Sequence, residues 1–308
     1  MQIILDSHFA DLDLFRESVD GWDLDFRLMQ RGGFRGAVLQ LAHPDILLGR
    51  ARFRCGLAQR GATPAGFRTF GIPGQSCRFW SRGRQYGPDE LLLYPSSNEI
   101  ASVTSVDFDI YAVSLTETLI DELCETLGVR WVGETVEAVR PTRAQMSRLR
   151  RTAEQACCAS SGSQRTRLAQ SVAEQLVVCF STAESPGRPR LRSRDRVVQR
   201  IVDHLHQGVG DIPNAAEMCR IACASERTLQ YAIRERFGVS PNEFVRFWRL
   251  NDARRMLLDS ESPGEAIAAV AERCGFRNPS VFAREFKLLH GELPSTTRAR
   301  GYRSPVEP

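Results

Sequence analysis

Two copies of one helical pattern lie 53 residues apart near the C-terminus. The first copy runs Leu229, Ile233, Phe237, Gly238 and Pro241, and the second runs Phe282, Phe286, His290, Gly291 and Pro294, with identical spacings. Apolar residues four apart share one face of a helix, and a glycine directly after them is typical of a helix end. Each copy follows a turn and another short helical segment. The pattern therefore predicts a duplicated helix-turn-helix, with two DNA-reading helices on one rigid body.

The composition is that of an ordinary globular protein, and the length of 308 residues allows two domains. No stretch approaches the roughly 18 consecutive apolar residues of a membrane span, and the first residues lack the pattern of a secretory signal. We therefore expect a cytoplasmic protein without a membrane partner. The nine cysteines are scattered and form no CxxC pair, which favours reduced thiols over disulfides or a zinc site.

The formal net charge of +4 is confined to the C-terminal part of the chain. Residues 192–308 carry 19 basic and 15 acidic side chains, whereas the preceding residues carry 22 of each. A small excess of this kind is common on solvated helices and proves little alone. Together with the paired helices it favours a polyanionic partner, double-stranded DNA.

The first 115 or so residues contain short apolar runs bounded by Gly, Pro and Asn, at 36–42, 67–72, 90–95 and 108–115. Such runs predict strands, and the whole region predicts a cupin-like β-sandwich or small barrel. From Glu117 the period changes, and helices are expected over residues 117–128, 142–159 and 164–182. The helices at 142–159 and 164–182 either cover the sheet or form a dimer seam, and the sequence leaves both alternatives open.

The predicted fold class is α+β, with a β-rich domain of residues 1–182, a linker of residues 183–195 and an all-α domain of residues 196–303. Pro, Gly, Ser and alternating Arg mark the linker. Ser240, Pro241 and Glu243 form an N-cap, a first-turn proline and a capping-box partner. They predict a long helix that ends near Leu258 and joins the two helix-turn-helix units.

The polar faces of the two reading helices predict the DNA contacts. The first face carries Arg227, Gln230, Tyr231 and Arg234, and the second carries Ser280, Arg284 and Lys287, with Arg277 just before its helix. Arginine can bind guanine through two hydrogen bonds, whereas Lys287 suits a phosphate. On any single helix such residues are usually only solvated. Because the two faces differ in composition, the predicted half-site is bipartite and directional.

The segments SERTLQYAIRERFGVSPNEFVRFWRLNDARRMLL and IAAVAERCGFRNPSVFAREFKLLHGELP resemble the DNA-binding domain of the AraC/XylS family of transcription regulators, over residues 196–303. The resemblance implies two helix-turn-helix units in successive major-groove segments on one face of DNA, and usually transcription activation. The chain departs from the family pattern at Cys223, where a turn glycine is usual, and in the HGELP and TTRAR segments near its end.

The family's N-terminal β-domain commonly binds an effector or mediates dimerisation. Here the segment CRFWSRGRQYG brings together Arg78, Trp80, Arg82 and Arg84, which suits an anionic nucleotide. The spacing of Arg78 and Arg82 resembles the RxxxR element by which PilZ domains hold cyclic di-GMP, although the second PilZ element is missing and RxxxR recurs elsewhere. The alternatives are solvated strand arginines, or a small amine, sugar or other metabolite bound inside the sheet.

The sequence thus predicts a ligand-responsive transcription regulator, most simply an activator that contacts RNA polymerase and works as a homodimer. It predicts neither an enzyme nor a resident cofactor or metal, since His8 and His43 lie far apart without an HxH pair. An enzyme with an appended DNA-targeting module would need a catalytic cluster that the sequence does not offer. A purely architectural DNA binder would not need a front end of about 190 residues.

Overall fold

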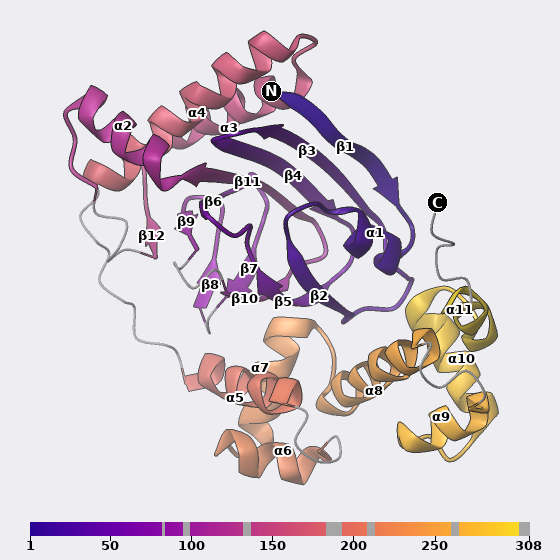
Figure 1. Cartoon of the computed structure of the whole chain (residues 1–308). Coiled ribbons are helices and arrows are strands. Elements are labelled where there is room, and N and C mark those ends of the chain that lie inside the picture. Colours follow the sequence, from indigo (N-terminus) through magenta and orange to yellow (C-terminus); the bar gives the residue numbers. More distant parts are fainter. Residues whose placement is uncertain are drawn as a thin grey trace. The chain divides into compact units, whose positions relative to one another are not determined.

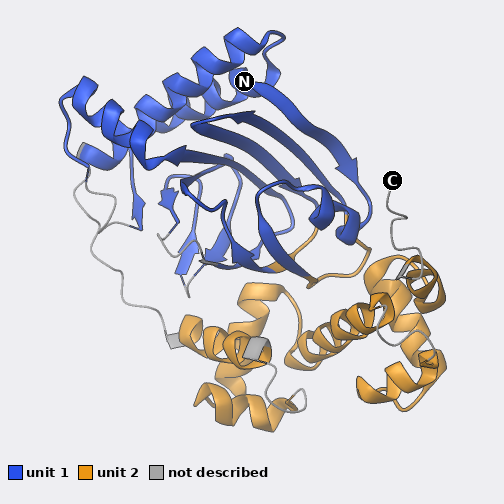
Figure 2. Cartoon of the chain, in the orientation of Figure 1, with its two compact units in different colours: residues 1–26, 35–54, 59–190 blue, residues 27–34, 55–58, 191–308 orange. Residues whose placement is uncertain are grey.

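The computed structural model describes residues 1–81, 84–94, 99–131, 137–182, 193–207, 213–259 and 265–301. It divides into two compact units (Figure 2). Unit 1 comprises residues 1–26, 35–54 and 59–190, and unit 2 comprises residues 27–34, 55–58 and 191–308. In the part of the chain that is described, no helix is both long enough and apolar enough to cross a membrane.

Two β-sheets form most of unit 1 (Figure 1). The antiparallel seven-stranded sheet contains, in order, β1 (Gln2–Phe9), β3 (Gly36–His43), β4 (Ile46–Phe53), β11 (Phe108–Thr116), β6 (Phe67–Pro73), β9 (Leu91–Leu93) and β12 (Ala138–Val139). The five-stranded sheet contains, in order, β2 (Asp23–Leu28), β5 (Leu57–Ala62), β10 (Glu99–Thr104), β7 (Phe79–Ser81) and β8 (Arg84–Tyr86). A short helix, α1 (Leu12–Ser18), follows β1.

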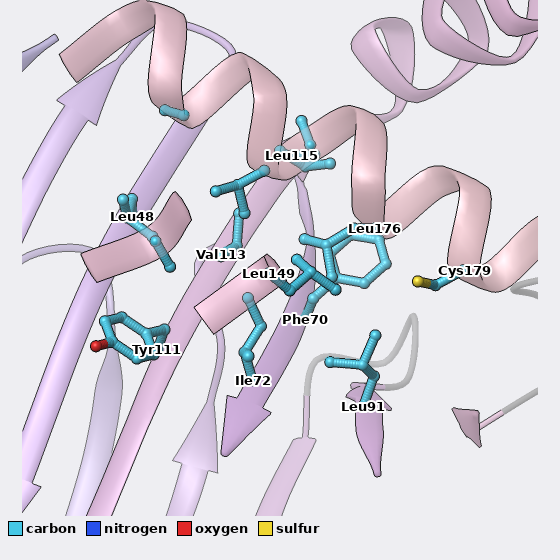
Figure 3. Close-up of a cluster of buried hydrophobic side chains, with 14 of the residues drawn as sticks. Leu48, Phe70, Ile72, Leu91, Tyr111, Val113, Leu115, Leu149, Leu176 and Cys179 are labelled. Carbon is cyan, nitrogen blue, oxygen red and sulfur yellow. The ribbon is translucent and has the colours of Figure 1, made fainter. Parts of the chain in front are cut away.

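Three helices follow the last long strand of unit 1: α2 (Glu117–Leu127), α3 (Arg143–Cys158) and α4 (Gly162–Thr182). Their apolar side chains share one buried cluster with the seven-stranded sheet. Figure 3 shows Leu149 and Leu176 of the helices beside Phe70, Ile72 and Val113 of the strands. Burial of this kind contributes about 1.5–3 kcal/mol per large side chain. The apolar sides of these helices therefore cover the sheet, and their role in a dimer seam stays a prediction.

A second apolar cluster holds aromatic rings from α1 and both sheets. Phe15 contacts Phe26 and Phe53 edge to face, with ring centroids 5.3 Å apart in both pairs, and Phe53 stacks on Phe108 at 5.2 Å. The fold class predicted from the sequence, a β-rich N-terminal part with following helices and an all-α C-terminal part, is thus confirmed. The run at 90–95 was predicted too long, because only Leu91–Leu93 pair as strand.

Unit 2 is helical apart from its two N-terminal segments. Its helices are α5 (Ser193–Gln207), α6 (Ala215–Ala222), α7 (Glu226–Phe237), α8 (Pro241–Leu258), α9 (Ile267–Arg273), α10 (Pro279–His290) and α11 (Pro294–Gly301). Residues 193–195 were predicted as linker, but they form the first residues of α5. Asp195 in this first turn forms a long-range ion pair with Arg236 of α7. The other linker residues, 183–192, lie outside the described residues.

The first of these segments, residues 27–34, contacts α8. The side chain of Asn251 accepts a hydrogen bond from the Leu28 amide and donates one to the Leu28 carbonyl, both at 2.9 Å. Arg27 forms an ion pair with Asp252 at 2.5 Å, and its guanidinium lies 4.1 Å from the ring centroid of Trp248. Residues 27–34 are thus a structural part of unit 2, which the division predicted from the sequence does not include.

Candidate DNA-binding surface

The two reading helices, α7 and α10, repeat one another in length and in position. Each has twelve residues, and the offset between their first residues is the 53 residues of the sequence pattern. Ser225 and Asn278 cap their N-termini through side-chain oxygens, and Gly238 and Gly291 end them in the left-handed conformation. Because local caps and periodicity determine both helices, the sequence predicted them closely.

The predicted inward faces of these helices are buried. Leu229 and Ile233 of α7, and Phe282, Phe286 and Leu289 of α10, are fully buried. Phe237 is only half-buried, and its ring packs against Phe244 of α8 with a centroid distance of 4.7 Å. Each reading helix is therefore fixed by one side to its unit, which leaves the opposite side for a partner.

All four predicted contact residues of α7 are exposed: Arg227, Gln230, Tyr231 and Arg234. The Tyr231 side chain is a ring between two cations, since the guanidinium groups of Arg227 and Arg194 lie 5.7 and 5.5 Å from its centroid. This arrangement presents an aromatic surface and donors that suit phosphates or base edges.

The predicted DNA contacts of the second helix-turn-helix are also exposed: Arg277, Ser280, Arg284 and Lys287. Arg284 lies 3.3 Å from a carboxylate oxygen of Glu285, which is itself buried. The structure thus brings the eight residues together as two exposed faces, four on each, whose contact with DNA stays a prediction.

Ion pairs between helices make unit 2 a defined frame for the two faces. Arg236 of α7 is buried and lies 2.8 Å from Asp195 of α5. Burial lowers the pKa of the Arg236 guanidinium below its usual value, and the neighbouring carboxylate opposes that shift. Arg254 of α8 lies 2.6 Å from Glu292, which also pairs with Arg300 of α11.

The turn between α6 and α7 contains Cys223, the residue that stands where the family pattern usually has a glycine. Cys223 caps α6 with φ 51° and ψ 49°, and among the described residues it alone has a positive φ without being glycine. The left-handed conformation that a glycine would adopt freely is therefore kept here by a residue with a side chain. Cysteine in place of the usual glycine therefore introduces backbone strain but keeps the helix-turn-helix geometry.

Sequence reasoning missed two arginines of α8, Arg246 and Arg249, which share a groove with Arg277 and Arg284. Their signal was available, because positions three apart lie on one face of a helix. The sequence-based prediction assigned α8 only a joining role, so its polar side was not considered.

The residues predicted for the effector lie on and beside the β7–β8 hairpin. Arg78 is exposed and Trp80 is half-buried. The Arg84 side chain already interacts within the protein. It forms an ion pair with the buried Glu90, and its guanidinium lies 4.7 Å from the ring centroid of Tyr86. Arg82 lies outside the described residues. Of the described residues predicted for the effector, Arg78 is thus the exposed arginine and Trp80 is the half-buried aromatic ring.

Comparison with known proteins follows the same division of the chain. Residues 218–300 match the model of a helix-turn-helix domain family. The chain is 33% identical over 108 residues to the HTH-type transcriptional activator RhaR of Yersinia pseudotuberculosis, and the match covers 35% of this chain and 36% of RhaR. The C-terminal region of this chain is thus similar to the helix-turn-helix domains of AraC-type transcription regulators.

A second relative of the AraC-type domain is a probable thc operon regulatory protein of Rhodococcus erythropolis, 29% identical over 99 residues, which are 32% of this chain and 30% of that protein. The chain thus matches only about a third of the length of these relatives. Among solved structures, the AraC-like transcriptional activator CuxR is 15% identical, with a TM-score of 0.44, over 87% of this chain and 100% of CuxR. The relatives are transcription regulators.

Proposed function

We propose that this chain is a transcription activator that reads promoter DNA with α7 and α10 and responds to a ligand bound by unit 1. The observation that carries the proposal is the pair of exposed faces on helices of one AraC-type domain, each fixed by a buried opposite side. DNA readers of this class place such helices in the major groove and fix their register through phosphates. Since promoter DNA is the proposed partner, we place the protein in the cytoplasm.

The DNA contacts are tested by electrophoretic titration of promoter fragments at two salt concentrations. Loss of Arg227 or Arg284 through substitution by alanine should cost about 1–3 kcal/mol and relax base preference at one position. Lys287→Ala should weaken binding to all sequences and lower the salt slope by about one. Unchanged affinity in all three variants would contradict the assignment of the two faces.

Activation implies a contact with RNA polymerase and, in this proposal, a homodimer formed by unit 1. Strand β1 is an edge of the seven-stranded sheet, and its Ile3 and Ile4 are 47% and 44% exposed. An edge strand with exposed apolar side chains is suited to pairing with a second copy. Sedimentation of the full chain should give a dimer, and Ile3→Lys should convert it to a monomer with an unchanged far-ultraviolet spectrum.

For the effector we propose cyclic di-GMP on the β7–β8 hairpin, with Arg78 binding phosphate and Trp80 stacking on a base. Arg84 would contribute only by leaving Glu90. Calorimetry should detect binding by the wild-type chain and at least a tenfold loss in Arg78→Ala. Arg54→Ala, which changes another RxxxR copy, is the matched control. No heat with wild type, or equal losses in both variants, would refute this effector.

A second ligand site is favoured by a cavity of about 70 Å³ in unit 1. Aromatic and aliphatic side chains line it, including Phe53 and Phe108. Its glutamines are already engaged, since the Gln40 side chain bonds the Asp20 backbone and Gln59 bonds Ser102. The cavity is apolar and far smaller than the roughly 300–1,000 Å³ of a typical ligand pocket, so a small apolar metabolite would enter only if the lining side chains moved apart. Ala51→Leu should abolish a thermal shift caused by such a ligand and leave cyclic di-GMP binding intact.

A further inference from the structure

Unit 2 contains a polar groove of about 590 Å³ bordered by the start of α6, the first half of α8 and the start of α10. Every residue that lines it belongs to residues 214–285, within the helical part of the unit. Four arginines face it, and they are Arg246, Arg249, Arg277 and Arg284. The groove extends the α10 reading face, because two of these four belong to that face.

The α8 arginines are held in place by the buried side of their own helix. Phe244, Phe247 and Trp248 are almost fully buried, whereas Arg246 is exposed and Arg249 is half-buried. The Arg249 guanidinium lies so close to Gly275 that a Cβ at this glycine would come within 3.0 Å of its Nη1. Gly275 has φ +79° and belongs to the turn between α9 and α10. The turn and the arginine therefore fit each other.

Basic side chains outnumber acidic side chains along the lining of the groove. Its one acidic lining residue is Glu285, whose side chain is 7% exposed. This carboxylate is shared among Arg246 at 3.6 Å, Arg284 at 3.3 Å and Arg31 at 3.2 Å. The lining thus carries four basic side chains and one acidic side chain. The groove therefore keeps a field that attracts an anion, strengthened by the positive N-terminal end of α10.

We propose that Arg246 and Arg249 bind phosphates of the DNA backbone that runs between the two reading helices. The inference rests on the proposed DNA binding and adds a third contact region to it. DNA that meets Arg277 and Arg284 must border the groove, and the backbone linking two major-groove segments then faces α8. Guanidinium groups there position the duplex without reading its sequence. They set the register of the two reading helices on the DNA.

The test is the salt dependence of DNA binding by the full chain. Each phosphate contact contributes about 0.9 to the slope of log K against log salt. Raising salt from 50 to 200 mM should therefore narrow the affinity gap between wild type and Arg246→Gln by about 3.5-fold, and the same holds for Arg249→Gln. Affinity for operator and unrelated DNA should fall by the same factor. Arg246→Lys keeps the charge and should keep the slope.

Arg255→Gln is the matched control, since Arg255 lies on the same helix and is similarly exposed but does not line the groove. Duplexes that carry neutral methylphosphonates between the two motifs should bind the wild-type chain more weakly than unmodified duplexes. The double variant with glutamine at Arg246 and Arg249 should bind both kinds of duplex equally. Wild type that binds no DNA refutes the proposed function. If the wild-type chain binds DNA and the glutamine variants have the same salt slope, the proposed phosphate contacts of the groove are refuted while the proposed function stands. A loss confined to one operator base also overturns it.

Discussion

The buried ion pair between Asp195 and Arg236 offers a quantitative test of how unit 2 is held together. It joins α5 to the reading helix α7, with an N···O distance of 2.8 Å and side chains that are 19% and 5% exposed. Asp195→Asn keeps the shape and removes the charge, so the buried Arg236 guanidinium loses this ion pair. Breaking a fully buried pair costs about 3–5 kcal/mol. Because Asp195 keeps some contact with water, we expect about 2–4 kcal/mol.

Hydrogen exchange of the α7 amides measures this loss in the full chain. Each 1.4 kcal/mol or so is tenfold in an opening equilibrium, so amides that exchange through opening of unit 2 should exchange roughly 30 to 1,000 times faster in Asp195→Asn. The lowered pKa of Arg236 agrees with this direction, since burial already disfavours its charged form.

The matched control uses the neighbouring surface pair of the same two helices. Arg194 and Glu235 lie 3.3 Å apart with side chains that are 53% and 49% exposed. Glu235→Gln should cost less than about 1 kcal/mol, which is a change of roughly fivefold at most. The reasoning is refuted if the two variants exchange at similar rates, because burial would then not decide the strength of the pair.

Three further results are expected. Cys223→Gly relieves the left-handed backbone and should raise the free energy of unfolding in urea by about 0.5–1 kcal/mol, and a decrease would contradict the strain. Ser240→Ala removes the α8 N-cap and should lower the same quantity by about 1 kcal/mol. Burial raises the pKa of Cys274 from 9.0 to about 11, so its stabilising effect is complete below pH 9 and is lost as pH rises to 11. The urea midpoint of wild type should fall over that range more steeply than that of Cys274→Ala.

The reading helices were predictable because their determinants are local. Fourteen consecutive residues contain the determinants of α7: the Ser225 cap, the buried Leu229 and Ile233, and the Gly238 ending. The role of each can be inferred from the sequence alone. The same holds for α8, whose Ser240, Pro241 and Glu243 fix its first turn. Side-chain exposure on these helices followed from the period alone.

Contacts between distant residues were not predictable in this way. Asp195 looks like linker until Arg236, 41 residues later, is placed beside it. The pairing of Leu28 with Asn251 joins residues 223 positions apart, and no pattern along the chain reports it. The arginine groove likewise needs α8 and α10 in place. Strands β7 and β8 have only three residues each, too few for a period to show.

The central claim is that two different faces of one domain read a bipartite DNA site. Selection of binding sequences from a pool of random duplexes tests it most directly. The wild-type chain should enrich a directional site with two unlike motifs about one helical turn apart, and Arg284→Ala should lose preference in one motif only. A half-site made of two identical motifs, a half-site with a single motif, or no enrichment at all would contradict the account.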